Sequence, residues 1–164
     1  MKILQLNAWT GRIKDGLTRF IAEGDFDVVC LQEAVWSDNC SNYLEMYIDP
    51  VEKIQREIGY KYVFKSSNYG TRTLDGRQFE VGNAILSKIP FKGTEEHVVF
   101  GEYEVAKSLD ECKNAIAKHS YTAQVAVLEN GIAIVNYHGY WQKDPLGCEE
   151  AKNFIISKQE MLSE

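Results

Sequence analysis

The chain has 164 residues, of which 45% are hydrophobic and 12% aromatic. This length fits one domain, and the apolar share excludes disorder as the main state. Its 18 basic and 24 acidic side chains leave a net charge of −6, which argues against a protein that coats duplex nucleic acid non-specifically.

The charge is uneven along the chain. Between residues 61 and 92, six basic side chains stand against two acidic ones, so this stretch carries +4 and the remainder −10. A locally positive stretch in an acidic protein leaves room for an anionic ligand.

The amino terminus predicts no targeting segment. Its apolar run ends at Asn7, and no segment of the chain is long enough to span a bilayer. The four cysteines include no Cys-x-x-Cys pair, which disfavours zinc and redox motifs, and Cys30 lies in a Val-rich run where we expect a small buried side chain. These patterns favour a cytoplasmic protein.

The first elements predict a β-α-β unit. Residues 3–9 alternate as a strand, and apolar residues recur at helical spacing from Leu17 to Ile21, with Gly24 as a stop signal. Residues 26–31 form a continuous apolar run, as in a central strand that is covered on both faces.

The next elements continue the mixture of helices and strands. A helix is expected from Val51 to Ile58, with Pro50 in its first turn and Gly59 at its end. Three strands are then expected, with a loop of Ser, Asn, Gly and Thr between the first two. The strands are residues 60–64, 79–86 and 97–105, and the loop is residues 66–77.

The clearest local signal is a β-hairpin. Residues 121–128 and 132–137 alternate, and Asn130-Gly131 predicts a two-residue turn between them. A last amphipathic helix is expected from Asp144-Pro145 onward. The order of elements predicts an α/β (α+β) fold without internal repeats.

Three polar residues follow apolar strands. Asn7, Glu33 and His138 each come directly after such a run, and strand ends in α/β folds are where sites are assembled. A carboxylate, an amide and an imidazole suit a divalent cation beside a phosphate, since Mg²⁺ needs only one or two carboxylates. Taken singly, an asparagine in such a place is more often a turn former, a glutamate is more often a solvated loop residue, and a histidine is more often a surface or hydrogen-bonded one.

Four segments together resemble the endonuclease/exonuclease/phosphatase superfamily of metal-dependent phosphoesterases. They occur in the family's order and span nearly the whole chain. They are Leu4-Gln5-Leu6-Asn7-Ala8-Trp9, residues 27–33 (Asp-Val-Val-Cys-Leu-Gln-Glu), residues 82–90 (Gly-Asn-Ala-Ile-Leu-Ser-Lys-Ile-Pro) and Val135-Asn136-Tyr137-His138-Gly139.

The resemblance implies phosphoester or phosphodiester hydrolysis on a four-layered αββα, DNase I-like sandwich, with Mg²⁺ (or Mn²⁺) as the cofactor. Glu33 would bind the metal, Asn7 would contribute to the metal site or hold a phosphate oxygen, and His138 would donate to the phosphate. Gln32 and Asn136 would support these groups, although Gln32 is equally typical of a strand residue that bonds a neighbouring loop.

Four residues are candidates for substrate binding. Tyr69 and Arg72 lie in the expected polar loop of the basic stretch, and Tyr140 and Trp141 follow His138. The alternative for Tyr69 and Arg72 is a solvated surface loop, and the alternative for Trp141 is a place in the core. The family's substrates include nucleic acids, nucleotides, inositol phosphates and phospholipid headgroups, and the sequence does not select among them.

Two family motifs are absent from the sequence. The Gly-Asp-Xaa-Asn strand and the Ser-Asp-His segment, which supply the general base and its partner, do not occur after His138. We therefore expect residues 1–164 to be the N-terminal portion of a truncated domain, to leave an apolar sheet face for a packing partner, and to be nearly inactive alone. The alternatives are a non-catalytic remnant that binds phosphate-bearing ligands or a complementing half, and an ordinary α/β binding domain.

Overall fold

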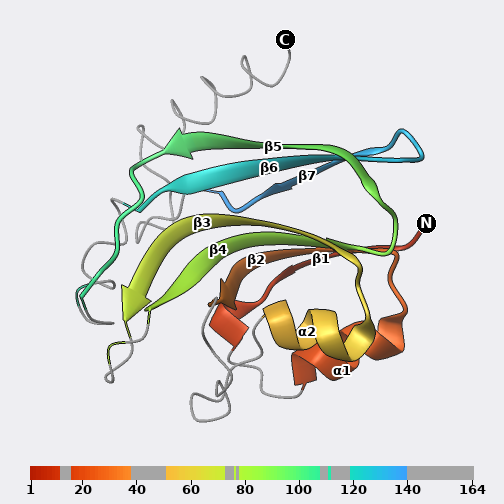
Figure 1. Ribbon diagram of the computed structural model, residues 1–164, viewed down its shortest axis with the longest axis horizontal. Coiled ribbons are helices and arrows are strands. Elements are labelled where there is room, and N and C mark those ends of the chain that lie inside the picture. The colour runs from red at the N-terminus through yellow and green to blue at the C-terminus, as the bar shows by residue number, and fades with distance from the viewer. Residues whose placement is uncertain are drawn as a thin grey trace, which may run out of the picture.

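The computed structural model describes residues 1–11, 16–37, 51–72, 76, 78–107, 111 and 119–139. Two α-helices, one short 3-10 helix and seven strands follow one another in these ranges (Figure 1). They are β1 (Ile3–Asn7), η1 (Trp9–Gly11), α1 (Gly16–Gly24), β2 (Val28–Trp36), α2 (Val51–Ile58), β3 (Tyr62–Arg72), β4 (Gln78–Ser87), β5 (Phe91–Phe100), β6 (Tyr121–Leu128) and β7 (Ala133–Tyr137).

The strands form two sheets. The first sheet has the order β1-β2-β4-β3, and the second has the order β5-β6-β7. β1 and β2 are parallel and are joined through α1, which confirms the predicted β-α-β unit, and the other pairs are antiparallel. Such a crossover helix is what a parallel connection requires.

The first sheet is covered on both faces. In Figure 1, α1 and α2 lie against one face, and the second sheet lies against the other. Side chains of β2 therefore alternate between two cores: Val29 and Leu31 pack with the helices, and Val28 and Cys30 pack with the second sheet. Burial raises the pKa of the Cys30 thiol to about 11, as expected of a small buried side chain.

These layers confirm the predicted α/β fold. Three of its layers (helices, first sheet, second sheet) lie in the described residues. The helix expected from Asp144 and the fourth layer of the sandwich lie outside those residues, as do Pro50 and the other three cysteines.

The interface between the sheets is apolar at one end and polar further along. Beyond the apolar part, buried amide side chains lie between the sheets, and we call four of them the amide seam. The amide seam consists of Gln32, Asn83, Gln124 and Asn136.

The loop predicted for residues 66–77 is wrong in its first half. β3 continues to Arg72 and pairs with β4 along its length, with Arg72 opposite Gln78. The polar composition has another cause, because Ser66 bonds Gln124 of the amide seam and Asn68 bonds Thr122 of the second sheet. Polar residues that face a polar interface therefore resemble a loop in sequence.

Other boundaries differ from the prediction as well: β1 ends at Asn7, and β2 begins at Val28 and continues to Trp36. The strand expected at residues 97–105 is Phe91–Phe100, and Gly101 ends it with a φ of 72°. The hairpin is confirmed, but its loop has three residues rather than two. Gly131, at φ 83°, donates to the Leu128 carbonyl while Leu128 donates to the Ile132 carbonyl, as in a turn followed by a glycine bulge.

The outer face of the second sheet keeps some apolar surface. Val135 points away from the first sheet and is 50% exposed, whereas its neighbour Ile134 is buried in the interface.

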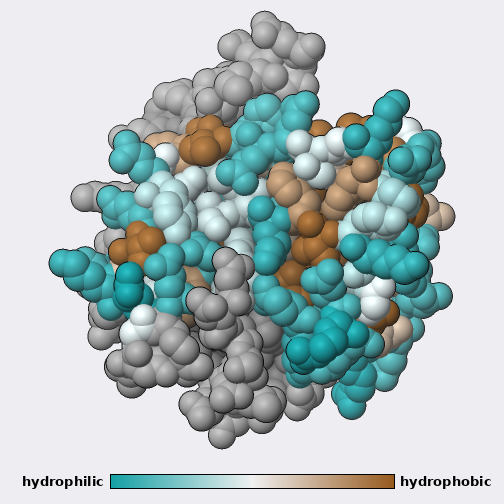
Figure 2. Space-filling view, in the orientation of Figure 1, coloured by the Kyte–Doolittle hydropathy of each residue, from teal (hydrophilic) through white to brown (hydrophobic). Residues whose placement is uncertain are grey.

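Figure 2 shows the largest hydrophobic patch of that view right of centre, toward the end where the amino terminus lies. In the described part of the chain, no helix has the length and apolarity to cross a membrane.

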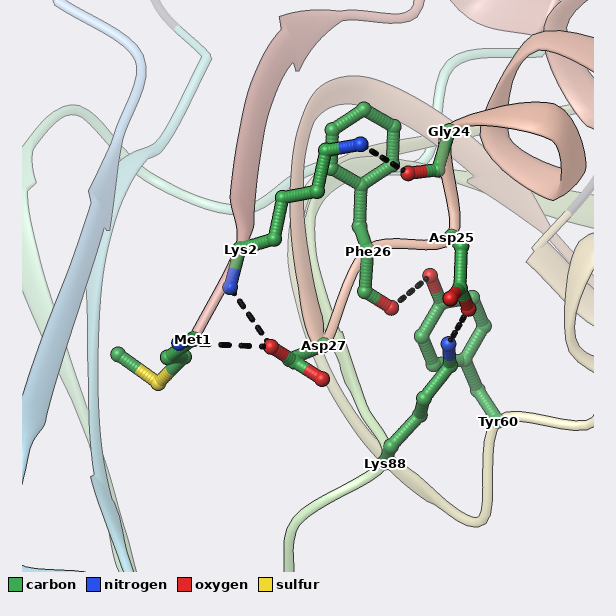
Figure 3. Close-up of polar contacts among 8 residues, drawn as sticks. All are labelled: Met1, Lys2, Gly24, Asp25, Phe26, Asp27, Tyr60 and Lys88. Carbon is green, nitrogen blue, oxygen red and sulfur yellow. Dashed lines mark hydrogen bonds and ion pairs between the residues drawn. The ribbon is translucent and has the colours of Figure 1, made fainter.

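Charged side chains gather where β1 and β2 begin (Figure 3). Asp27 accepts from the Lys2 amide at 2.6 Å and lies 3.8 Å from the terminal ammonium, and Asp25 pairs with Lys88. The Tyr60 hydroxyl donates to the Phe26 carbonyl at 3.0 Å, so α2 and β3 are linked to the same turn.

Candidate active site

Glu33 lies within β2, not after it as the sequence suggested. Leu31 pairs with Ala84 and Ala34 pairs with Gly82, so Gln32 and Glu33 together oppose the single residue Asn83. Glu33 is the extra residue of this bulge and has a φ of 48°, which non-glycine residues rarely adopt. The bulge releases Glu33 from both cores, and its side chain is 32% exposed in a strand that is otherwise buried.

Two other strands bring polar side chains to Glu33. Asn7, the last residue of β1, donates from Nδ2 to Glu33 Oε1 at 3.0 Å. His138, directly after β7, places Nε2 3.8 Å from the same oxygen. The structure therefore brings together the three residues that the sequence singled out, although they are separated by up to 131 positions along the chain.

The remaining polar atoms of this group fit a divalent cation. Glu33 Oε2 makes no hydrogen bond or ion pair with any described residue, so one carboxylate oxygen is open for a ligand. Asn7 orients Glu33 through Nδ2, and its Oδ1 accepts from the Trp9 amide at 2.8 Å, which leaves one lone pair of that oxygen for a ligand. No cluster of three or more acidic, His or Cys ligands occurs among the described residues, and a single carboxylate matches the habit of Mg²⁺ of keeping several waters.

The amide seam supports the site from below. Gln32 donates to Asn136 Oδ1 at 2.6 Å, and Asn136 donates in turn to the Leu31 carbonyl at 3.0 Å and to Gln124 Oε1 at 3.0 Å. These bonds reach β2 at Leu31 and Gln32, directly before Glu33, and link it to β6 and β7. Gln32 and Asn136 therefore fix the position of β2, which contains Glu33, relative to β7, which His138 follows.

A cavity of about 280 Å³ opens beside Glu33 and His138. Its walls come from both sheets and from the segment that precedes β6. Besides these two residues, it is lined by Trp9, Asn68, Tyr69, Val81, His119, Ser120 and Tyr121.

A second bulge shapes the opposite wall of the cavity. Ser67 pairs with Gly82 and Tyr69 pairs with Val81, so Asn68 is an extra residue in β3. A Cβ at Gly82 would lie 2.0 Å from the Ser66 carbonyl oxygen, so only glycine permits β3 to come this close. The glycine of the third motif thus has a packing role next to the site.

The predicted substrate-binding residues fall into three groups. Tyr69 lines the cavity, as expected, although from a strand and not from a loop. Arg72 does not line it, and its Nη1 donates to the Gly76 carbonyl at 3.4 Å beyond the end of the strand pair. Tyr140 and Trp141 lie outside the described residues.

The sequence did not predict that His119 and Trp9 line the cavity. Trp9 is 57% exposed at a φ of 46°, held through the bond from its amide to Asn7. His119 stacks on Tyr69 with ring centroids 4.1 Å apart. Trp9 belongs to the first motif and was a detectable signal, whereas nothing near His119 in the sequence indicated its position.

Comparison with known proteins supports the fold. No family model and no curated protein matches the chain. The structure is similar to an endonuclease/exonuclease/phosphatase family protein from Leptotrichia buccalis C-1013-b, with a TM-score of 0.54 and 19% identity over 96% of this chain. It is also similar to an endonuclease/exonuclease/phosphatase from Beutenbergia cavernae DSM 12333, with a TM-score of 0.56 and 15% identity over 84% of this chain.

The chain spans only 62% and 38% of the lengths of these two proteins. At such identities the likeness concerns the fold, and the mixed α/β layers match it. The resemblance predicted from the four motifs is confirmed at this level: the chain has the DNase I-like fold of endonuclease/exonuclease/phosphatase proteins.

Proposed function

We propose that this chain provides the metal-binding and phosphate-binding side of a Mg²⁺-dependent hydrolase of phosphoester or phosphodiester bonds. The observation that carries the proposal is the convergence of Asn7 and His138 on one carboxylate oxygen of Glu33, beside a cavity. The motif order and the shared fold support the same reaction class.

Each residue has a role that follows from its contacts. Glu33 would bind the cation through its open oxygen, Oε2, and Asn7 would hold the carboxylate in that direction. When bound, Mg²⁺ would stabilise negative charge on the phosphoryl oxygens. His138, next to Glu33 at the cavity wall, would donate a hydrogen bond to a phosphate oxygen.

A non-catalytic role is the second candidate. The sequence holds no Gly-Asp-Xaa-Asn or Ser-Asp-His motif after His138, so it lacks the family's general base. The 164 residues would then bind metal and phosphate, or a complementing half, without turnover. We expect near-background hydrolysis of bis(p-nitrophenyl) phosphate by the chain in Mg²⁺. Full activity would refute the missing-base interpretation.

The metal assignment is tested by Mn²⁺ broadening of NMR signals. Substoichiometric Mn²⁺ should broaden the amide signals of Asn7, Glu33 and His138, leave that of Gly131 sharp, and be displaced by Mg²⁺. Glu33→Gln should abolish the broadening, because the amide supplies no charge for the ion. Glu129→Gln, at the distant hairpin turn, is the matched control. Unchanged broadening in Glu33→Gln would remove Glu33 from the metal site.

A further inference from the structure

His119 is a buried side chain that the proposed reaction does not use. It is 4% exposed, and its Nδ1 has no hydrogen-bond partner among the described residues. A buried nitrogen without a partner is rare in folded proteins and asks for a ligand or water to complete it. His119 lines the cavity, but Nδ1 itself is not exposed there, so a molecule bound in the cavity would reach this nitrogen after a half-turn of the ring about its Cβ–Cγ bond, which keeps the ring plane and the stack on Tyr69.

The position of His119 is fixed by its neighbours. Its ring stacks on Tyr69 at an interplanar angle of 26°. The next residue, Ser120, donates its amide to the Asn68 carbonyl at 3.2 Å, and the Thr122 hydroxyl donates to Asn68 Oδ1 at 2.8 Å. The β3 bulge thus holds the two rings as one unit, which we call the Tyr69–His119 pair.

The chemistry of the pair suits an uncharged partner. Burial lowers the pKa of His119, while the carboxylate of Glu104 opposes that shift to a lesser degree. At neutral pH the imidazole is therefore uncharged and offers one donor and one acceptor. Such a group matches a neutral polar edge better than it matches a phosphate.

The other residues that line the cavity further restrict the kind of ligand that fits it. Among the described residues that line the cavity there is no lysine or arginine, which disfavours a headgroup with several phosphates. Trp9, Tyr69 and Tyr121 provide aromatic surface for a flat ring or a quaternary ammonium. A quaternary ammonium has no hydrogen-bonding atom, so it would leave the His119 nitrogen without a partner.

We infer that the Tyr69–His119 pair binds the organic group attached to the phosphate, and that this group is an uncharged planar ring with hydrogen-bonding atoms at its edge, such as a nucleobase. This inference rests on the proposed function, because the phosphate would lie at Glu33 and His138. The pair forms part of the cavity wall together with those two residues, so one molecule would contact both sets.

The three histidines of the chain allow a direct test by NMR. The imidazole signals of His97, His119 and His138 would be followed in Mg²⁺ while inorganic phosphate, adenosine monophosphate or phosphocholine is added. Phosphate should move His138 only, and adenosine monophosphate should move His138 and His119. Phosphocholine should leave His119 unmoved, and His97, exposed on β5, should not respond to any probe.

A variant pair gives a second readout. His119→Phe keeps a ring against Tyr69 and removes the nitrogens, so it should weaken adenosine monophosphate binding about tenfold without changing phosphate binding. His97→Phe should change neither.

The inference is overturned if adenosine monophosphate moves His138 but not His119 in the unmodified chain, or if phosphocholine moves His119 as strongly. If no probe moves His138, the proposed function itself fails.

Discussion

Strand β2 begins beside one group of charged side chains and contains another, and the two groups differ in what their carboxylates bind. At the beginning of the strand, Asp25 pairs with Lys88 and Asp27 lies near the terminal ammonium (Figure 3). Within the strand, Glu33 contacts only an amide and an imidazole among the described residues.

This difference separates structural from functional charge. A carboxylate that already has an ammonium partner has little left to offer a ligand, whereas Glu33 has no ammonium or guanidinium partner among the described residues and has one open oxygen. Both groups include a residue in the left-handed region, Asp25 at φ 46° and Glu33 at φ 48°. Backbone strain alone therefore does not distinguish the site. The distinguishing feature is that Glu33, unlike Asp25, has no lysine partner among the described residues.

Disrupting the amide seam should have the largest effect on stability. Asn136→Leu removes the acceptor of Gln32 Nε2 and the donor to Gln124 Oε1 and leaves both atoms buried without a partner, so we expect a loss of about 3 kcal/mol in the free energy of unfolding. Urea denaturation measures it. Val135→Leu, on the exposed side of the same strand, should change stability by less than about 0.5 kcal/mol. Similar values for both variants would contradict a supporting role for the seam.

Gly82→Ala should have the second-largest effect on stability. The added Cβ meets the Ser66 carbonyl at 2.0 Å, and backbone must shift to relieve the contact, at a cost of about 2 kcal/mol. Gly93→Ala, in β5, is the control because its Cβ would meet nothing within 4 Å. Thermal unfolding of both variants gives the comparison, and the prediction is wrong if Gly82→Ala melts with Gly93→Ala.

The strain at Glu33 should be visible in a matched pair of variants. Glu33→Gly should unfold with a free energy about 1 kcal/mol higher than Glu33→Ala, because glycine adopts a positive φ without steric cost. At Val35, where φ is ordinary, the order should reverse. Both Glu33 variants should lose the Mn²⁺ effect, so stability and metal binding would separate at this position.

The smallest effect is expected at the beginning of β2. The Lys88 ammonium, by hydrogen bond and charge, holds the pKa of Asp25 below its usual 3.8. The pair therefore stabilises the fold above about pH 4, and this contribution is lost as pH falls through the lowered pKa. Asp25→Asn should be slightly less stable than the unmodified chain at pH 7, and the difference should shrink as the pH is lowered below about 4, as measured by urea denaturation. A difference that does not change with pH would point to another cause.

Local patterns in the sequence predicted most of the elements correctly. The β-α-β unit, the helix Val51–Ile58 and the hairpin at Gly131 depend on periodicity and turn residues close together in the chain. The errors lie where distant residues decide. The second part of β3, from Ser66 onward, has the composition of a loop because its polar side chains satisfy an interface that only exists once the second sheet packs on the first.

The sequence by itself identified Asn7, Glu33 and His138 as the candidate site and placed the chain among DNase I-like folds, because these properties lie in short contiguous motifs. Only the tertiary structure decided that Asn7 orients Glu33, that a bulge exposes the carboxylate, and that His119 joins the cavity on Tyr69. The physical reason is that strand register and sheet packing bring together residues whose spacing along the chain carries no trace of the contact.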